Sequence, residues 1–480
     1  MRADRAASAG KVDSRLTNDP SEARASDVSV QQHVRTDVTR RETGATGLDD
    51  PIDELREWLE ANWDPELTVA KWWERLGLAG WSAPLLAADS YGRGLSRSDA
   101  LRAQALIAAH GALGAPQGLG LALAAPTIVA HGTRTQVEEY VRDIVTGKKG
   151  WCQLFSEPGA GSDLASLSTR ATRDGDVWIV NGQKVWTSSG HLADLGMLLA
   201  RTNPSVPKHQ GITWLVLDMH QPGVEVRPLR EMTGSTMFSE VFFTDAEVRD
   251  AARIGDVDNG WRVANTTLQI ERSGMGAGGD VPARGAVIAR AGTIAGDLDR
   301  RAGDFVVRAD RTSRRSTSSM GPRSPASMYI ELARTFGKNK DPLIRQELVR
   351  LHTLREIIRL NTERHKAARA AGSDIAGIAN FSKLAMGDIV RLQRDLGLRI
   401  LGARGMLHAF DDDGRAVVAA QRGDSSATLV TSQALAAQAL PIFGGTDQIQ
   451  RNIIGERTLG LPKEPGDMAH VPFSELPRNR

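Results

Sequence analysis

The spacing of apolar residues changes twice along this chain. From 51 to 150 apolar positions recur every three or four residues, as Leu55 and Leu59 do, and this is the period of helices with one buried face. Between 151 and 255 the apolar runs are short and are separated by turn residues, which is typical of strands. Helical spacing returns from 256 to 463. The pattern therefore predicts helical, then β, then helical structure.

The middle block carries two strong hairpin signals. Asp174-Gly175 and Asn181-Gly182 flank the short run Val177–Val180. Such dipeptides favour the tight turns that join antiparallel strands. The runs GITWLVLDM and SEVFFTDAEV are further strand candidates. We therefore expect a sheet built largely from hairpins.

The two ends of the chain and one internal segment lack this patterning. Residues 1–50 are polar and rich in Arg, Asp, Ser and Thr, so we expect a disordered extension. The basic, serine-rich segment 300–328 is expected to be a mobile loop within the last helical block. Residues 464–480 are interpreted as a C-terminal tail. The three patterned blocks between them are interpreted as domains.

The composition is that of an ordinary globular protein. Of the 480 residues, 41% are hydrophobic and 25% are charged, and the formal net charge is +2. A net charge so close to zero favours neither nucleic acid nor an anionic membrane as the main partner. The most apolar window, 113–132, is interrupted by prolines and glycines. A buried helical hairpin is expected there rather than a membrane span.

Cys152 is the only cysteine, so no intrachain disulfide can form and a reducing cytoplasm is the expected compartment. It lies in an apolar run, where a small buried residue is expected rather than a catalytic thiol. The N-terminal sequence has no apolar core of the kind found in secretion signals, so none is expected. No metal site is expected either.

One glycine motif suggests a nicotinamide dinucleotide but lacks the context for it. GMGAGG, Gly274–Gly279, fits G-x-G-x-x-G, and Asp297 and Asp299 follow at about the right distance. A dinucleotide-binding fold needs a strand immediately before the glycines. The preceding GWRVANTTLQIERS has helical spacing instead. We expect these small residues to allow a helix to approach something large and flat.

A second glycine-rich run, WCQLFSEPGAGSDLASL at 151–167, has a stronger context. Its tight loop offers free backbone N–H groups and hydroxyls that suit an anion or a flavin edge, although an ordinary turn would look the same. NGQKVWTSSG at 181–190 and PIFGGTDQIQRNIIGER at 441–457 follow it. In sequence and order, these three runs closely resemble the signatures of the acyl-CoA dehydrogenases. The resemblance covers about residues 52–463, leaving out the tail and the segment 300–328.

The resemblance implies an α+β fold: an N-terminal helical domain, a middle β-barrel-like domain and a C-terminal helical bundle. It also implies FAD-dependent α,β-dehydrogenation of an acyl-CoA thioester, as in β-oxidation of lipids. Electrons would pass to an electron-transfer flavoprotein, and the chain would form a homodimer or homotetramer. Two alternatives stay open: a non-catalytic or half-site subunit of a heteromeric enzyme, and an acyl-CoA oxidase.

The same resemblance implies which residues contact the ligands. Arg334 and the loop beginning at Arg399 would reach the cofactor of a neighbouring subunit. Acyl-CoA contacts are implied for Ser162, Arg272 and Gly445. FAD contacts are implied for Leu154, Phe155, Ser156, Gly161, Ser162, Trp186, Thr187, Ser188, Arg334, Arg399, Gly402, Thr446 and Gln448.

The reaction needs a carboxylate that removes the α-proton of the thioester. Many family members carry a glutamate where this chain has Gly444. Asp447 lies three residues further on, but with Gln450 it is typical of a capping box at a helix start and would point elsewhere. The carboxylate is therefore absent from the C-terminal signature.

Glu271 is the better candidate. It continues the helical stripe formed by Trp261, Ala264 and Leu268, and an inward carboxylate is costly unless it is paired or functional. The residues alone leave a structural ion pair with Arg272 equally open. The resemblance favours catalysis, because isovaleryl-CoA and long-chain members carry their base in a Glu-Arg pair on this helix and Gly or Ala at the C-terminal position. It also implies that the N–H of Gly444 binds the thioester oxygen.

Overall fold

The computed structural model describes residues 50–276, 289–306, 325–371, 373, 375–422, 426–463, 468 and 470–477. The chain divides into two compact units, Met1–Asp53 and Glu54–Arg480. In the first unit only the start of helix α2, Pro51–Asn62, is described. The extension expected at 1–50 therefore lies outside the described residues, apart from residue 50.

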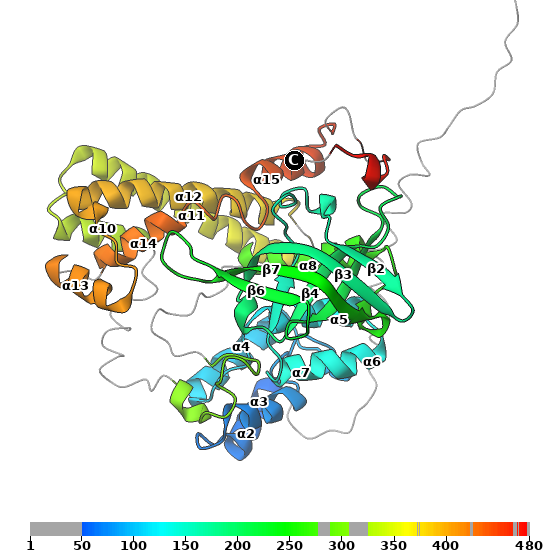
Figure 1. Ribbon diagram of the computed structural model, residues 1–480. Helices are drawn as coiled ribbons and strands as arrows, with labels where there is room; N and C mark the ends of the chain where they lie inside the picture. Colours follow the sequence, from blue (N-terminus) through cyan, green and yellow to red (C-terminus); the bar gives the residue numbers. More distant parts are fainter. Residues whose placement is uncertain are drawn as a thin grey trace, which may run out of the picture. The chain divides into compact units, whose positions relative to one another are not determined.

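Helices occupy the block where helical spacing predicts them (Figure 1). The indole N–H groups of the buried Trp72 and Trp73 donate to the carbonyls of Leu113 and Gly114, at 2.6 and 2.8 Å, and so fix the following loop. The elements are α3 (Val69–Leu78), α4 (Arg97–His110), η3 (Gly120–Ala124), α5 (Ala125–His131), α6 (Arg134–Gln136), η4 (Val137–Val141) and α7 (Arg142–Val145).

The apolar window 113–132 differs from the expected helical hairpin. Its second half forms the consecutive elements η3 and α5, with Thr127 and Ile128 fully buried. Its first half has no regular helix because Trp72 and Trp73 already hold the carbonyls there. Among the described residues, no helix has the length and apolar character needed to span a membrane.

The middle block forms one eight-stranded sheet in the order β6-β7-β3-β2-β4-β5-β8, with β1 paired to β4. This sheet is not closed, so the expected barrel-like form is corrected to an open sheet. Its strands are β1 (Trp151–Leu154), β2 (Arg170–Asp174), β3 (Val177–Ser188), β4 (Leu195–Arg201), β5 (Ile212–Asp218), β6 (Val224–Leu229), β7 (Phe238–Arg249) and β8 (Arg253–Ile254).

One hairpin signal was correct and the other was wrong. Asp174-Gly175 begins the turn between β2 and β3, and Asp174 pairs with Val177. Asn181-Gly182 instead lies inside β3, where the pairing with β7 shifts register. Gly182 takes a φ of +150° there and packs against Thr169, so the glycine serves a bulge rather than a turn.

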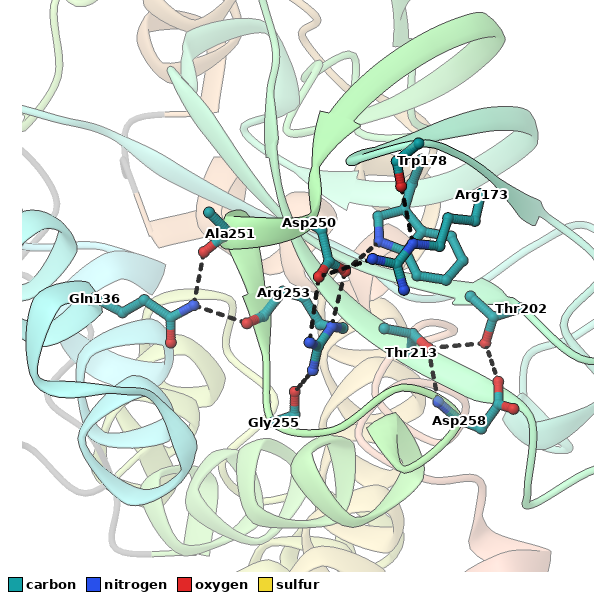
Figure 2. A network of polar contacts seen from close by, with 11 residues as sticks. Gln136, Arg173, Trp178, Thr202, Thr213, Asp250, Ala251, Arg253, Gly255 and Asp258 are labelled. Carbon is teal, nitrogen blue, oxygen red and sulfur yellow. Dashed lines mark hydrogen bonds and ion pairs between the residues drawn. The ribbon is translucent and has the colours of Figure 1, made fainter.

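Gln136 connects the helical block to the edge of the sheet (Figure 2). Its amide donates to the carbonyls of Ala251 and Arg253, at 2.8 and 2.7 Å. The guanidinium of Arg253 in turn pairs with Asp250 at 3.1 Å. These contacts fix β8, the strand that precedes the last helical block.

The last block is helical, and α12 is its central element. It contacts α8, α10, α11, α14 and α15, and α11 and α12 run side by side in Figure 1. The elements are α8 (Gly260–Gly276), η8 (Ala302–Phe305), α10 (Pro325–Thr335), α11 (Pro342–Ala370), α12 (Ile378–Leu401), η9 (Gly402–Met406), α13 (Asp412–Arg422), α14 (Ser426–Ala436), α15 (Asp447–Ile453), η10 (Ile454–Thr458) and η11 (Phe473–Glu475).

The segment interpreted as a mobile loop, 300–328, is structured at both ends. The N–H of Val69 donates to Arg300 at 2.8 Å, and the N–H of Ala302 donates to Leu67 at 2.8 Å. These backbone pairs hold the start of the segment against α3, and its last residues begin α10. Residues 307–324 lie outside the described residues.

Part of the expected C-terminal tail is also held in place. The N–H of Phe473 donates to Val206 at 2.9 Å, and its ring lies 4.0 Å from the guanidinium of the buried Arg201. Stacking on an arginine and pairing of the backbone explain why this part does not behave as a free tail.

A buried ion pair joins the loop after β1 to β3. The ammonium of Lys184, fully buried, lies 2.8 Å from Glu157 and donates to the carbonyl of Phe155 at 2.9 Å. Glu157 also accepts from the backbone N–H groups of Ser168 and Thr169 at 2.7 and 2.9 Å. Burial alone would raise the pKa of Glu157, but Lys184 and these hydrogen bonds lower it to about 2.

We expect Lys184→Met to lower the free energy of unfolding by about 3–5 kcal/mol, because it leaves the Glu157 carboxylate buried without its counter-charge. Denaturant unfolding measures the change. Arg227→Met is the matched control, since it removes an exposed pair of similar length, 2.7 Å to Glu225, and should change stability little. Equal losses in the two variants would contradict a special role for the buried pair.

The same pair predicts how stability depends on pH. The pKa of Glu157 falls from 4.5 to about 2 on folding, so its contribution is complete above pH 4.5 and is lost as the pH falls towards 2. Glu157→Gln lacks this contribution. Unfolding measured between pH 4.5 and 2 should therefore show a smaller acid-induced loss in Glu157→Gln than in the unmodified chain.

Candidate functional site

The loop after β1 and the end of β3 lie against each other. The N–H of Val185 donates to the carbonyl of Ser156 at 2.9 Å, next to the contact between Lys184 and Phe155. Leu154 and Phe155 are buried, whereas Ser156 is half-buried. Two sets of predicted FAD residues, 154–156 and 186–188, thus come from different strands to one place.

Trp186 projects from a bulge in β3. The pairing with β7 shifts register between Lys184 and Thr187, and Trp186 takes a φ of +61°. This conformation is uncommon for a large side chain and persists only where the surroundings impose it. The ring is 60% exposed and meets Phe238 edge-on at 5.9 Å between ring centroids. An exposed, fixed aromatic face suits stacking on a planar ligand.

The two residues after Trp186 face different surroundings. Ser188 is half-buried, so its hydroxyl can reach a ligand beside the indole ring. Thr187 is fully buried, and its hydroxyl has no hydrogen-bond partner within the described part of the chain. Thr187 also pairs with Ser239 of β7, so the sheet holds this residue in place.

Gly161 and Ser162 lie on the exposed tip of the turn that follows Glu157. The backbones of Glu157 and Ala160 exchange two hydrogen bonds of 3.1 Å, which close the turn. Asp163 then accepts from Lys208 at 2.7 Å. Burial alone would raise the pKa of Asp163, but the hydrogen bonds from Lys208 and Ser166 outweigh it and lower the pKa. The turn is therefore held from both ends while its tip stays open.

The start of α8 is pinned to β5. Asp258, in a left-handed turn with φ +63°, donates its N–H to the hydroxyl of Thr213 at 3.0 Å, and its carboxylate accepts from Thr202 (Figure 2). A Cβ on Gly260 would lie 2.5 Å from the backbone nitrogen of Trp214. Only glycine allows this close approach, which sets the position of the whole helix.

Glu271 lies on α8 beside β1. Gln153 of β1 donates its side-chain amide to the Glu271 carboxylate at 3.4 Å. Burial raises the pKa of Glu271, and the hydrogen bond from Gln153 and the charge of Arg272 oppose the rise. Among the described residues, no ion pair is formed by Glu271, so the structural pair with Arg272 that the sequence left open is not present.

The C-terminal segment approaches α8 through Arg457 of η10. Burial lowers the pKa of Arg272, Glu271 opposes this effect, and the positive charge of Arg457 lowers the pKa further. In addition, α12 contacts both α8 and α15. The helix α8, which carries Glu271, and the helix α15, which follows Gly444, therefore both pack on α12.

Gly444 and Gly445 form the turn before α15. Both have positive φ, +63° and +84°, which favours glycine. The amide of Gln450 donates to their carbonyls at 3.1 and 3.3 Å, and Asn380 of α12 donates to Gln450 at 2.6 Å. The glycine carbonyls are thus tied to the protein interior.

The expected capping box at α15 was wrong. Thr446, not Asp447, is the N-cap, and its hydroxyl accepts from the N–H of Ile449. Asp447 is buried and pairs with Arg391 at 2.9 Å and Lys383 at 3.5 Å. Two cations bind the carboxylate more strongly than one backbone N–H does, and they draw it away from the cap. The expectation that Asp447 points elsewhere than the substrate agrees with these contacts.

The remaining predicted FAD residues are spread along α12 and its neighbours. Gln448 is exposed on the first turn of α15. At the other end of α12, Arg399 is exposed and Gly402 ends the helix with a φ of +57°. Arg334 is exposed and pairs with Glu331 at 2.6 Å.

The Arg334 segment and the Arg399 segment lie side by side. The guanidinium of Arg404 is 5.5 Å from the ring of Phe336. These segments meet near the C-terminal end of α12, whereas α15 packs along its N-terminal half as far as the middle, where Asn380, Lys383 and Arg391 lie. At about 1.5 Å per residue, Gly402 lies about 16 Å along α12 from Arg391, so the two groups are separated by roughly half of the helix.

The nicotinamide motif does not have the context that such a fold requires. Gly274 lies inside α8, which occupies the place of the required strand, and the end of the motif lies outside the described residues. Asp297 accepts from the N–H of Arg290 at 2.9 Å and pairs with Arg300 at 3.1 Å. Cys152 is fully buried and burial raises the pKa of its thiol, as expected for a structural residue.

Sequence reasoning missed Gln153 and Arg457. Gln153 is the one half-buried residue of the strand WCQL, whose other side chains are buried. A polar residue in such an apolar run indicates that one face of the strand meets a polar neighbour. Arg457 lies in the quoted C-terminal signature, but nothing in its spacing indicates that it approaches α8.

Known proteins resemble this chain along most of its length. A family model described as Acyl-CoA dehydrogenase, middle domain, matches residues 152–246, and one described as Acyl-CoA dehydrogenase, C-terminal domain, matches 326–459. Acyl-CoA dehydrogenase IpdE1 of Mycobacterium tuberculosis is 34% identical over 398 residues, 82% of this chain and 88% of the relative. Acyl-CoA dehydrogenase FadE34 of the same organism is 49% identical over 198 residues, 41% of this chain but 27% of that longer relative.

Solved structures share the fold. The ChsE4-ChsE5 complex from Mycobacterium tuberculosis has a TM-score of 0.57 at 24% identity, covering 88% of this chain and 100% of the other. A structure titled Tcur3481-Tcur3483 steroid ACAD has a TM-score of 0.60 at 22% identity, covering 88% and 99%. At such identities the likeness concerns the fold alone.

Proposed function

Because the chain belongs to the acyl-CoA dehydrogenase family of oxidoreductases, we propose that it dehydrogenates an acyl-CoA thioester with FAD as cofactor and Glu271 as base. The observation that carries the proposal is the position of Glu271. Its carboxylate is largely buried and bound by Gln153, one residue before the loop at 154–156. A base is thus held next to the segment that resembles the flavin-contacting signature.

The residues around Trp186 fit a flavin. An exposed indole ring in an imposed conformation offers a stacking face, and the half-buried Ser156 and Ser188 offer hydroxyls at its edge. FAD, when bound, would accept the hydride that leaves the β-carbon of the thioester. Leu154 and Phe155, beside Ser156, are buried in the apolar core and support the loop from behind.

The surroundings of Glu271 support its role as a general base. Burial raises the pKa of the carboxyl, so its affinity for a proton is higher than that of an exposed glutamate. The α-proton of the thioester passes to this carboxylate as the bond to the β-hydrogen breaks. The N–H groups of Gly444 and Gly445 are the donors proposed for the thioester oxygen, where negative charge develops.

We propose that the functional enzyme contains more than one chain. The Arg334 and Arg399 segments lie at the C-terminal end of α12, about half a helix length from the contact between Arg391 and Asp447 at the start of α15. In a homodimer or homotetramer they would serve the cofactor of a neighbour. The proposed acceptor of the electrons is an electron-transfer flavoprotein.

A half-site subunit is the second candidate. Two solved structures with this fold carry titles that name two different chains, and Arg334 pairs with Glu331 instead of standing free for a cofactor. The purified chain alone distinguishes the two proposals. One FAD per chain and turnover without a second protein would exclude the half-site subunit.

We expect Glu271→Gln to reduce the rate of flavin bleaching by about a hundredfold or more, the usual contribution of a general base. Anaerobic bleaching with a panel of straight-chain, branched and ring-bearing acyl-CoA thioesters measures this rate. Acyl-CoA binding should be kept, since the amide has the same shape. Glu240→Gln is the control, because Glu240 likewise accepts from a glutamine at 3.4 Å but lies on β7. Full activity of Glu271→Gln would rule out this base.

We expect Trp186→Ala to weaken FAD binding by about tenfold or more, because an aromatic contact is worth about 0.5–1.5 kcal/mol beyond the area it buries. The stability of the cofactor-free chain should change little, since the ring is 60% exposed. Titration of the cofactor-free chain with FAD and denaturant unfolding measure the two effects. Leu85→Ala, at a position 56% exposed, should alter neither.

A further inference from the structure

We propose that Gln153 is a positioning residue for Glu271: its side-chain amide fixes the direction of the carboxylate and keeps it ionised for proton abstraction. This inference rests on the proposed function. It adds a residue that neither the sequence motifs nor the resemblance assigns.

The strand β1 presents Gln153 to α8. Cys152 and Leu154, on either side, are fully buried in the core of the sheet. Since successive side chains of a strand point to opposite faces, Gln153 points to the other face, where it is half-buried and meets Glu271. Pairing with Met197 of β4 fixes the backbone at this position. The donor is therefore mounted on a rigid element.

The part of α8 that carries Glu271 is also held in place by hydrogen bonds. Four residues earlier on the same helical face, Thr267 is fully buried and shares a 3.0 Å hydrogen bond with Thr127 of α5. One residue before it, Thr266 hydrogen-bonds His131 at 2.7 Å. Because both helix and strand are fixed, the backbones that carry Gln153 and Glu271 are held within reach of each other, and their side chains meet at 3.4 Å.

An amide donor suits this position better than a cation. An ammonium or guanidinium at this distance would lower the pKa of Glu271 strongly and reduce its strength as a base. A neutral amide orients the carboxylate and favours its charged form only modestly. Burial raises the pKa of Glu271, and Gln153 limits the rise, so the carboxylate remains ionised at a lower pH than burial alone would allow.

The charged groups around Glu271 also influence its pKa, directly or through a neighbour, so the variants compared must leave these groups unchanged. Arg272 follows it on α8, and Arg457 of η10 acts on Arg272. On α5, His131 faces the preceding turn of α8. On α12, Lys383 and Arg391 are engaged with Asp447. The elements η3 and β1, which lie on the same side, contain no charged residue.

The test compares the pH profiles of two variants of the complete chain with bound FAD. Gln153→Met keeps the length of the side chain and removes the donor. Gln183→Met removes the same kind of donor from a 3.4 Å contact with Glu240, away from Glu271. If Gln153→Met folds poorly, Gln153→Leu takes its place.

The acid limb of kcat/KM should move to higher pH by about half to one unit in Gln153→Met, since one unit corresponds to a tenfold change in the ionisation equilibrium. On the alkaline plateau kcat should fall several-fold while KM stays nearly constant, because the base is ionised but less well oriented. Gln183→Met should reproduce the profile of the unmodified enzyme. A merely structural role of Gln153 would lower stability without moving the acid limb, and that outcome would overturn the inference.

A second measurement does not depend on turnover. In chain labelled with ¹³C at glutamate carboxyls, the signal of Glu271 is identified by its loss in Glu271→Gln, and its titration midpoint is followed. The midpoint should rise in Gln153→Met and stay constant in Gln183→Met. If no acyl-CoA bleaches the flavin, the proposed function fails while this titration still tests the contact. A midpoint unchanged by Gln153→Met would refute the contact whatever the activity.

Discussion

The buried ion pair between Glu157 and Lys184 holds together the part of the molecule on which the candidate site depends. Lys184 contacts both the carboxylate of Glu157 and the carbonyl of Phe155, and it stands two residues before Trp186. The pair therefore sets the distance between the loop after β1 and the bulge of β3. Removing one partner leaves an uncompensated buried charge, and this makes the arrangement nearly all-or-none.

The ion pair between Glu157 and Lys184 also helps to impose the backbone conformation of the bulge at Trp186. A positive φ at a bulky residue costs free energy, of order 1–3 kcal/mol, and persists only when neighbouring contacts impose it. Lys184 on one side and the pairing of Thr187 with Ser239 on the other supply those contacts. The consequence is an exposed indole ring that cannot fold back onto the sheet, which is the property that a stacking surface needs.

The sequence predicts the helical, β and helical succession because periodicity depends on burial along one face, and that is a local property. It also predicts that Glu271 points inward, because this residue continues an apolar stripe along its helix. The turn predicted at Asn181-Gly182 was wrong because the same dipeptide occurs in turns and in bulges. The packing of Thr169 against Gly182, which the local sequence does not reveal, favours the bulge. The cap predicted at Asp447 was wrong because Lys383 and Arg391, which bind this carboxylate, lie on α12, far away in sequence. Thr446 is the N-cap instead.

Gln153 and Arg457 could not be found from spacing, since their partners lie on α8 and the contacts arise from packing between distant segments. The two residues act on different groups of α8, since Gln153 acts on Glu271 and Arg457 acts on Arg272. Gln153 favours the charged carboxylate of Glu271 through a hydrogen bond, and Arg272 favours it through its positive charge. Arg457 lowers the pKa of Arg272, but this guanidinium stays charged wherever a carboxyl titrates. A carboxylate that must accept a proton is better served by a neutral hydrogen-bond donor than by a full ion pair, because an ion pair would lower its pKa further. The absence of an ion pair to Glu271 within the described residues therefore agrees with the role proposed for it as a base.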